Sequence, residues 1–154
     1  MKTPLLGSYS SEDCLFLLKT IEPNFYTVED KERLIQTGQL HYSQMVSQES
    51  KPSAEYEQLF YALTSQYKQQ LADEVLNLSF LISQNIQQDV CVVSLVRAGT
   101  PIGVLVNRAL NEYSRYNSVH YSISIVRDKG IDVNALDYLI FYLKIDPQSI
   151  VFID

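Results

Sequence analysis

Residues 89–96, DVCVVSLV, form a continuous run of apolar and β-branched side chains. A strand with one solvent-facing side alternates, whereas a strand covered on both faces reads as an uninterrupted apolar run. Strand patterns also occupy 118–126 and 149–154, and helical patterns at 100–116 and 132–145 separate the three strands. This alternation predicts an α/β fold with a three-layer, mostly parallel sheet, because right-handed crossovers join parallel strands.

The part of the chain before this strand shows mainly helical patterns. Residues 10–21 start with two serines and two acids before an apolar continuation, which predicts a capped helix. Residues 27–38 predict a short helix capped by Thr27, and 54–86 carry the longest helical pattern. We therefore expect a helical cap over 1–53 and an α/β domain over 54–154, together forming a single compact unit.

Composition limits the class of protein. A chain of 154 residues has the length of about one domain. It contains no apolar run near the roughly 18 residues of a membrane span, which predicts no membrane partner. Two widely spaced cysteines favour a reducing, cytoplasmic location over a disulfide scaffold. The net charge of −6 argues against broad nucleic-acid binding.

The carboxyl ends of parallel strands are where ligands bind in open α/β sheets. Arg97 and Gly99 follow the first strand, and Thr100 and Pro101 are suited to the start of a helix. A helix N-terminus beside an arginine can hold an anion such as phosphate. The alternative is an ordinary capped turn with a surface arginine, and these residues alone leave both interpretations open.

A second basic loop follows the middle strand. Arg127, Lys129 and Gly130 are expected at the same sheet edge as Arg97. Two basic, glycine-containing loops at one edge suggest an anionic ligand. The alternative is solvated turn charge, partly neutralised by the neighbouring aspartates.

The cysteines and histidines raise the hypothesis of a thiol protease. Nucleophilic catalysis requires a cysteine within hydrogen-bond reach of a histidine and a lowered thiol pKa. Acids precede Cys14 in the sequence and disfavour its thiolate, and Cys91 lies in an apolar strand. His41 and His120 complete the set, which lacks the spacing of a zinc site.

Five stretches in this order resemble one known family: GSYSSEDCLFLLK, KERLIQTGQLHYSQM, SLVRAGTPIGVLVNRAL, HYSISIVRDKGID and SIVFID. The chain is similar over nearly its whole length to the phosphoribosyltransferase-like family labelled StiP. Members are often named cysteine proteases and occur with bacterial tellurite-resistance and stress genes. The resemblance implies a phosphoribosyltransferase-like, Rossmann-like sheet with roles in stress response and nucleotide metabolism.

The resemblance also implies a ligand and its site. Phosphoribosyl pyrophosphate or a similar nucleotide would bind with magnesium at the carboxyl edge of the sheet. The loop that would hold pyrophosphate resembles Arg97, Ala98, Gly99 and Thr100. Asp154 resembles the catalytic acid that contacts the ribose. Lys129, where relatives have arginine, and Asp128 are departures that weaken phosphate binding.

These expectations combine into one main hypothesis and three alternatives. The main hypothesis is transfer of a ribose-phosphate unit, by a domain that is truncated at Asp154 and becomes an enzyme when a following phosphate loop is present. A non-catalytic nucleotide- or phosphate-binding stress module, a cysteine protease and an interaction scaffold are the alternatives. An incomplete sheet would also leave an apolar edge exposed, which favours a homo-oligomer.

Overall fold

The structure, a computed structural model, describes residues 4–22, 24–39, 50–126 and 128–154. They divide into two units, one formed by Met1–Lys19 with Tyr67–Asp154 and one by Thr20–Gln66. The first unit holds the sheet and the candidate site. The predicted division into 1–53 and 54–154 stays a prediction.

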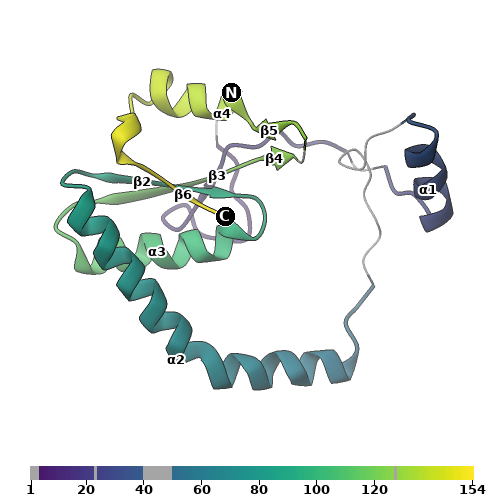
Figure 1. Cartoon of the computed structure of the whole chain (residues 1–154), viewed down its shortest axis with the longest axis horizontal. Coiled ribbons are helices and arrows are strands. Elements are labelled where there is room, and N and C mark those ends of the chain that lie inside the picture. Colours follow the sequence, from purple (N-terminus) through teal and green to yellow (C-terminus); the bar gives the residue numbers. More distant parts are fainter. Residues whose placement is uncertain (1–3, 23, 40–49, 127) are drawn as a thin grey trace. The chain divides into compact units, whose positions relative to one another are not determined.

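A four-stranded, fully parallel sheet forms the centre of the first unit (Figure 1). Its strands, in spatial order, are β1 (Leu15–Phe16), β3 (Ser118–Ile123), β2 (Val90–Leu95) and β6 (Ile150–Ile153). Every residue of β2 is buried, as its continuous apolar run predicted. The predicted α/β class with a mostly parallel sheet is confirmed.

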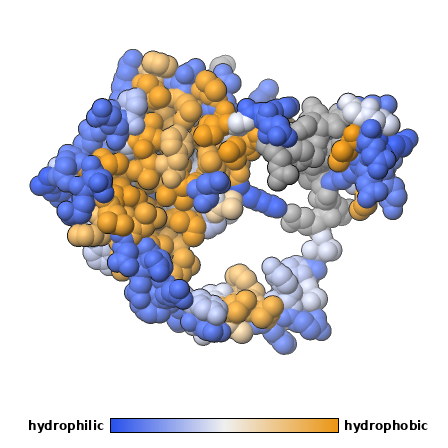
Figure 2. All heavy atoms as spheres, viewed as in Figure 1, coloured by the Kyte–Doolittle hydropathy of each residue, from blue (hydrophilic) through white to orange (hydrophobic). Residues whose placement is uncertain are grey.

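Helices cover both faces of the sheet. On one face, α3 (Gly99–Tyr113) and the last part of α2 (Ala54–Asn85) pack against Val90, Val92 and Ile153 of the sheet. On the other face lie α4 (Val133–Asp137) and the π-helical turn η2 (Tyr138–Tyr142) that continues it. Figure 1 shows α3 and α4 on opposite sides of the strands, and Figure 2 shows apolar residues gathered over this part of the molecule.

The remaining elements are short. The second unit contains α1 (Val28–Gln36), and the Thr27 hydroxyl caps it as predicted by accepting from the backbone N–H of Asp30. Asp132 caps α4 through the backbone N–H of Asn134. A small antiparallel pair, β4 (Ile125–Val126) and β5 (Gly130–Ile131), follows β3, and the 3₁₀ turn η3 (Pro147–Ser149) precedes β6.

The predicted helix at residues 10–21 is wrong. These residues form a turn, in which the Ser10 hydroxyl accepts from the backbone N–H of Asp13, followed by β1. β1 pairs with the open edge of β3, and the N–H of Leu17 donates to the carbonyl of Ser122 at 2.9 Å. Hydrogen bonds to the backbone of β3 favour this extended conformation over the helix that the local sequence pattern predicts. In this conformation both Cys14 and Leu17 are fully buried.

Within the described ranges, β6 lies at one edge of the sheet and pairs with β2. Its four residues are apolar, and Phe152 is half exposed. Unprotected edges of this kind favour pairing with another chain. The predicted self-association through this edge stays a prediction. None of the described helices is long and apolar enough to cross a membrane.

Candidate functional site

The structure brings two of the predicted site segments together at the carboxyl edge of the sheet. A Cβ built on Gly99 would collide with the carbonyl oxygen of Ile153 and lie 3.2 Å from Cα of Asp154. Arg97 and Ala98 immediately precede α3, so the loop and Asp154 are neighbours. This proximity follows from the pairing of β2 with β6.

Thr100 does not cap α3 as predicted. The helix begins one residue earlier, with Ala98 in the cap position and no side-chain cap. The Thr100 side chain is buried instead, and its hydroxyl lies 2.6 Å from that of Ser122. A hydroxyl so placed is directed toward the sheet rather than toward a ligand at the helix N-terminus.

The second basic loop lies in the β4–β5 hairpin. Lys129 and Gly130 line a shallow cavity of about 370 Å³, which the Arg97–Thr100 loop does not line. Gly130 has a φ of 85°, a conformation that glycine adopts without strain. Arg127 lies outside the described residues. The proposed roles of these residues in binding an anion stay predictions.

Magnesium was expected from the family resemblance alone. In the described part of the chain, no group of three or more His, Cys, Asp or Glu side chains is placed to hold a metal ion. The magnesium expectation stays a prediction.

A buried cluster of polar side chains lies between the sheet and α3. Its members are fully or almost fully buried, and they come from three elements and the turn before β1: Cys14, Ser94, Thr100, His120 and Ser122. The Oγ of Ser94 lies 2.8 Å from Nε2 of His120 and 3.0 Å from Oγ of Ser122. Burying polar groups is costly unless they are hydrogen-bonded, and these side chains meet that need through one another.

The register of β2 against β3 creates this cluster. Ser94 pairs with Ser122, and His120 lies two residues before Ser122 on the same face of β3. Side chains two residues apart in a strand share a face, so these three side chains all point toward α3. Gly103 of α3 makes room for the imidazole, because a Cβ there would lie 2.5 Å from its Nε2.

The hydrogen bonds of His120 define its protonation. Nδ1 lies 2.8 Å from the backbone carbonyl oxygen of Asp13, which can only accept. Nδ1 therefore carries the hydrogen. Burial lowers the pKa of His120, so the ring is neutral and Nε2 is an acceptor that faces the Ser94 hydroxyl. His120 is thus oriented as a base.

Cys14 lies at the other side of the cluster. Burial raises the pKa of its thiol to about 12, although the adjacent Ser122 hydroxyl lowers it. The negative charge of Asp13 raises it further. In this state the thiol is protonated and inaccessible, with a polar partner beside it.

Asp13 is held from outside the cluster by Arg108 of α3. Nε and Nη2 of Arg108 donate to its two carboxylate oxygens at 2.6 and 2.7 Å, a bidentate geometry. The Arg108 side chain holds the pKa of Asp13 down, at about 2. Since Asp13 carries the carbonyl that orients His120 and precedes Cys14, this ion pair fixes both positions.

Cys91 has different surroundings. It belongs to the apolar cluster on the opposite face of the sheet, and burial alone raises the pKa of its thiol to about 12. Cys91 also lines a cavity of about 430 Å³ at the amino ends of the strands, far from the carboxyl edge. His41 lies outside the described residues.

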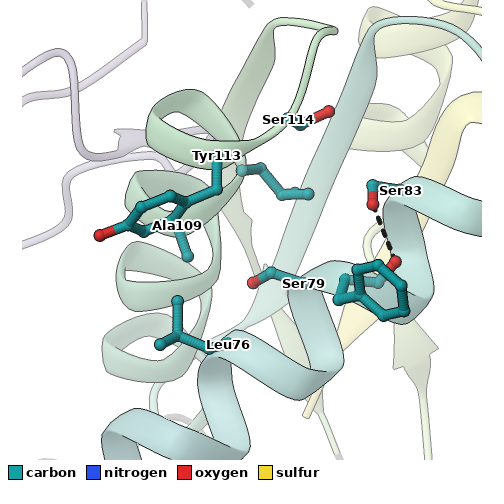
Figure 3. Close-up of a pocket in the computed structure, with 8 residues that line it drawn as sticks. Leu76, Ser79, Ser83, Ala109, Tyr113 and Ser114 are labelled. Carbon is teal, nitrogen blue, oxygen red and sulfur yellow. Dashed lines mark hydrogen bonds between the residues drawn. The ribbon is translucent and has the colours of Figure 1, made fainter.

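A smaller cavity of about 70 Å³ lies between α2 and α3, with Leu76, Ser79 and Tyr113 among its walls (Figure 3). In the close-up, Leu76 and Ser79 of α2 and Ala109 of α3 face the space between the two helices. Cys14 and His120 line neither this cavity nor the two larger ones described above. All five members of the polar cluster are 4% exposed or less, so the cluster is closed to solvent.

Sequence reasoning considered Cys14 and His120 but missed Ser94 and Ser122, and it assigned Thr100 to a phosphate-binding loop rather than to this cluster. One signal was available: Ser118, His120 and Ser122 are polar residues at two-residue spacing, hence on one face of a strand, and Ser94 interrupts the neighbouring apolar run. Their meeting depends on strand register, which pairs residues 26 and 28 positions apart.

The fold and the cluster define an α/β protein with a buried thiol, an imidazole base and linking hydroxyls. Residues 7–154 match the family described as "Tellurite-like stress resistance cysteine protease StiP", and the chain belongs to this family. It is 44% identical over 156 residues to "Cysteine protease StiP" of Acinetobacter baylyi (strain ATCC 33305 / BD413 / ADP1). That alignment covers 100% of this chain and 39% of the relative. No solved structure matches.

The expected phosphoribosyl transfer is contradicted by these comparisons, because both the family and the relative are named cysteine proteases. The expectation rested on the resemblance to a phosphoribosyltransferase-like family, together with an arginine- and glycine-containing loop at the edge of a parallel sheet. Many α/β proteins of different function share that arrangement, so the fold does not determine the reaction. The predicted links to StiP and to stress resistance are confirmed.

Proposed function

We propose that this chain is part of a thiol-dependent peptidase of the stress response, with Cys14 as the nucleophile and His120 as the base. The observation that carries the proposal is that the backbone carbonyl of Asp13, which directly precedes the fully buried Cys14, lies 2.8 Å from Nδ1 of the buried His120. Cys91 has no comparable polar surroundings. The names of the family and of the relative support the reaction class.

The reaction has two steps. In the first, the thiolate of Cys14 attacks the carbonyl carbon of a peptide bond, a C–S bond forms, and the C–N bond breaks. The proton taken from the thiol passes to the leaving amine. In the second step water hydrolyses the thioester, which releases a carboxylic acid and restores the thiol.

The structure describes a resting state of such an enzyme. Cys14 has no exposed surface and its thiol pKa is about 12, so attack requires the turn before β1 to uncover it. Asp13 and Arg108 keep this turn on α3. We therefore expect activity to depend on conditions that loosen the turn.

Cleavage of an unfolded protein such as casein tests the proposal. Replacing Cys14 by serine removes the nucleophile and changes one atom, and Cys91→Ala is the matched control. We expect Cys14→Ser to abolish cleavage and Cys91→Ala to retain most of it. Equal cleavage by the parent and Cys14→Ser, or no cleavage by the parent, contradicts the proposal.

We also propose that the sheet belongs to the Rossmann-like class. In the sheet, the three longer strands lie in the order second, first, third along the chain. Doubly wound, Rossmann-like sheets contain this order, which supports assigning the chain to that class. The cytoplasmic location remains part of this proposal.

A further inference from the structure

The direction of every hydroxyl hydrogen in the polar cluster follows from the carbonyl of Asp13. Because that carbonyl accepts from Nδ1 of His120, Nε2 must accept from Ser94. A serine hydroxyl has one hydrogen, so the hydrogen between Ser94 and Ser122 comes from Ser122. By the same argument Thr100 donates to Ser122.

The hydroxyls therefore form a directed chain that ends on the base. Ser122, fully buried, pairs with Phe16 in the β1–β3 register, and its carbonyl accepts from the N–H of Leu17, so the segment that begins at Cys14 runs alongside it. The Ser122 hydroxyl also lowers the pKa of the Cys14 thiol, against the larger effect of burial. Ser94, also fully buried, joins Ser122 to Nε2 of His120 over distances of 3.0 and 2.8 Å. No other contact between the thiol and the imidazole is needed for a proton to pass.

We propose that Ser122 and Ser94 form a proton relay from the thiol of Cys14 to Nε2 of His120. The proposal rests on the proposed function and deepens it by naming how the nucleophile is activated. Ser122 contacts the reacting thiol, whereas Ser94 acts through Ser122 and is a positioning residue. This arrangement replaces the direct thiol–imidazole contact that nucleophilic activation ordinarily uses.

The transfer balances at each atom. The thiol proton goes to Oγ of Ser122, the hydrogen of Ser122 goes to Oγ of Ser94, and that of Ser94 goes to Nε2. Each hydroxyl keeps one hydrogen, and the products are a thiolate and an imidazolium. The Ser122 hydroxyl then points at the thiolate and stabilises it.

Charged groups near the relay act on both ends. The carboxylate of Asp13 favours the imidazolium and disfavours the thiolate. Arg108 compensates for this, because it pairs with that carboxylate through two hydrogen bonds. Thr100 donates to Ser122 and keeps its hydroxyl oriented toward Ser94.

Alkylation of the two cysteines by iodoacetamide tests the relay without any peptidase substrate. Mass spectrometry measures labelling of Cys14 relative to Cys91 in the same molecules, so a change in global opening acts on both. We expect Ser94→Ala to lower this ratio at least about tenfold, as His120→Gln does, because each removes the route to the base. The double variant should lower it no further.

A purely structural role for Ser94 gives the opposite sign. Loosening the cluster exposes the thiol, so the ratio would stay unchanged or rise in Ser94→Ala, and that result overturns the relay. A lowered ratio in a protein that cleaves no peptide keeps the relay and refutes the proposed function. The two failures are therefore distinguishable.

The parent protein provides a second readout that needs no variant to fold. Nitrogen-15 NMR of the His120 ring, identified by the signals lost in His120→Gln, reports which nitrogen carries the hydrogen. We expect a protonated Nδ1 and an unprotonated Nε2 at pH 8. A protonated Nε2 reverses the hydroxyl direction and overturns the relay.

Discussion

The imidazole of His120 donates from Nδ1 to the backbone carbonyl of Asp13 at 2.8 Å, and Asp13 directly precedes Cys14. One turn therefore places the thiol and orients the base. The contact joins residues 107 positions apart, from the turn before β1 to β3. It is the structural reason for treating this turn as part of the site.

The Asp13–Arg108 pair predicts a pH dependence of stability at low pH. Its carboxyl pKa falls from 3.8 to about 2 on folding, so its stabilisation is complete above about pH 3.8. That contribution is lost as the pH falls through about 2. Thermal unfolding followed by circular dichroism should show a flatter dependence between pH 4 and 2 for Asp13→Asn than for the parent.

Arg115→Ala is the control for this experiment. Arg115 bonds to the side chains of Gln87 and Tyr116 rather than to a carboxylate. It should leave the slope between pH 4 and 2 as in the parent, and Arg108→Ala should flatten it. An unchanged slope in Asp13→Asn contradicts the role assigned to the pair.

The lowered pKa of His120 predicts that stability also depends on pH in a second, higher range. Burial lowers its folded-state pKa below the usual value of 6.5, so the unfolded chain binds the proton more tightly. Its contribution to stability is present above pH 6.5 and declines as the pH falls below that value. The thermal midpoint should fall from pH 7 to 5 more in the parent than in His120→Gln; equal falls contradict the buried, neutral ring.

The close packing of Gly103 against His120 predicts that replacing this helical glycine by alanine lowers the stability of the protein. Replacing glycine by alanine inside a helix ordinarily stabilises it, by up to about 1 kcal/mol. At Gly103 the new Cβ would lie 2.5 Å from Nε2 of His120 and 3.1 Å from Cβ of Ser94. We expect Gly103→Ala to lower the free energy of unfolding in urea by about 1–3 kcal/mol, as overpacking does. A stabilised variant would show that the cluster is not packed against α3.

Cys91 predicts a purely packing role. Its side chain lies among Val93, Tyr121 and Ile123 and is 2% exposed. Cys91→Val should change the free energy of unfolding by less than about 1.5 kcal/mol. Cys91→Ser should cost about 1–3 kcal/mol in the same urea experiment, because it buries a hydroxyl among apolar groups. A larger loss in the valine variant contradicts this interpretation.

Local patterns were sufficient to predict most of the sheet. The unbroken apolar run of β2 and the strand–helix alternation after it depend on neighbouring residues, and the structure confirms them. The same reasoning wrongly predicted a helix where the turn before β1 lies. Its capping serine and spaced apolar residues are compatible with a helix, and a contact with β3, more than 100 residues away, decides against one.

The candidate site was harder to predict for the same physical reason. Ser94, His120 and Ser122 are brought together by strand register, and Thr100 joins them because α3 begins at Gly99. The loop at Arg97 was locally compatible with both an anion site and an ordinary turn, and the assumed resemblance to phosphoribosyltransferases led to the wrong reaction. Residue types and their sequence neighbours identified candidate side chains, and only the tertiary structure showed which of them lie together.

The most direct test of the account is to find which residue a peptide-directed electrophile modifies. A peptidyl chloromethyl ketone alkylates an activated thiol with loss of chloride, and tryptic mass spectrometry locates the adduct. The account predicts an adduct on Cys14 of the parent that is lost in His120→Gln. An adduct on Cys91 alone, or a Cys14 adduct that forms equally well without His120, contradicts it.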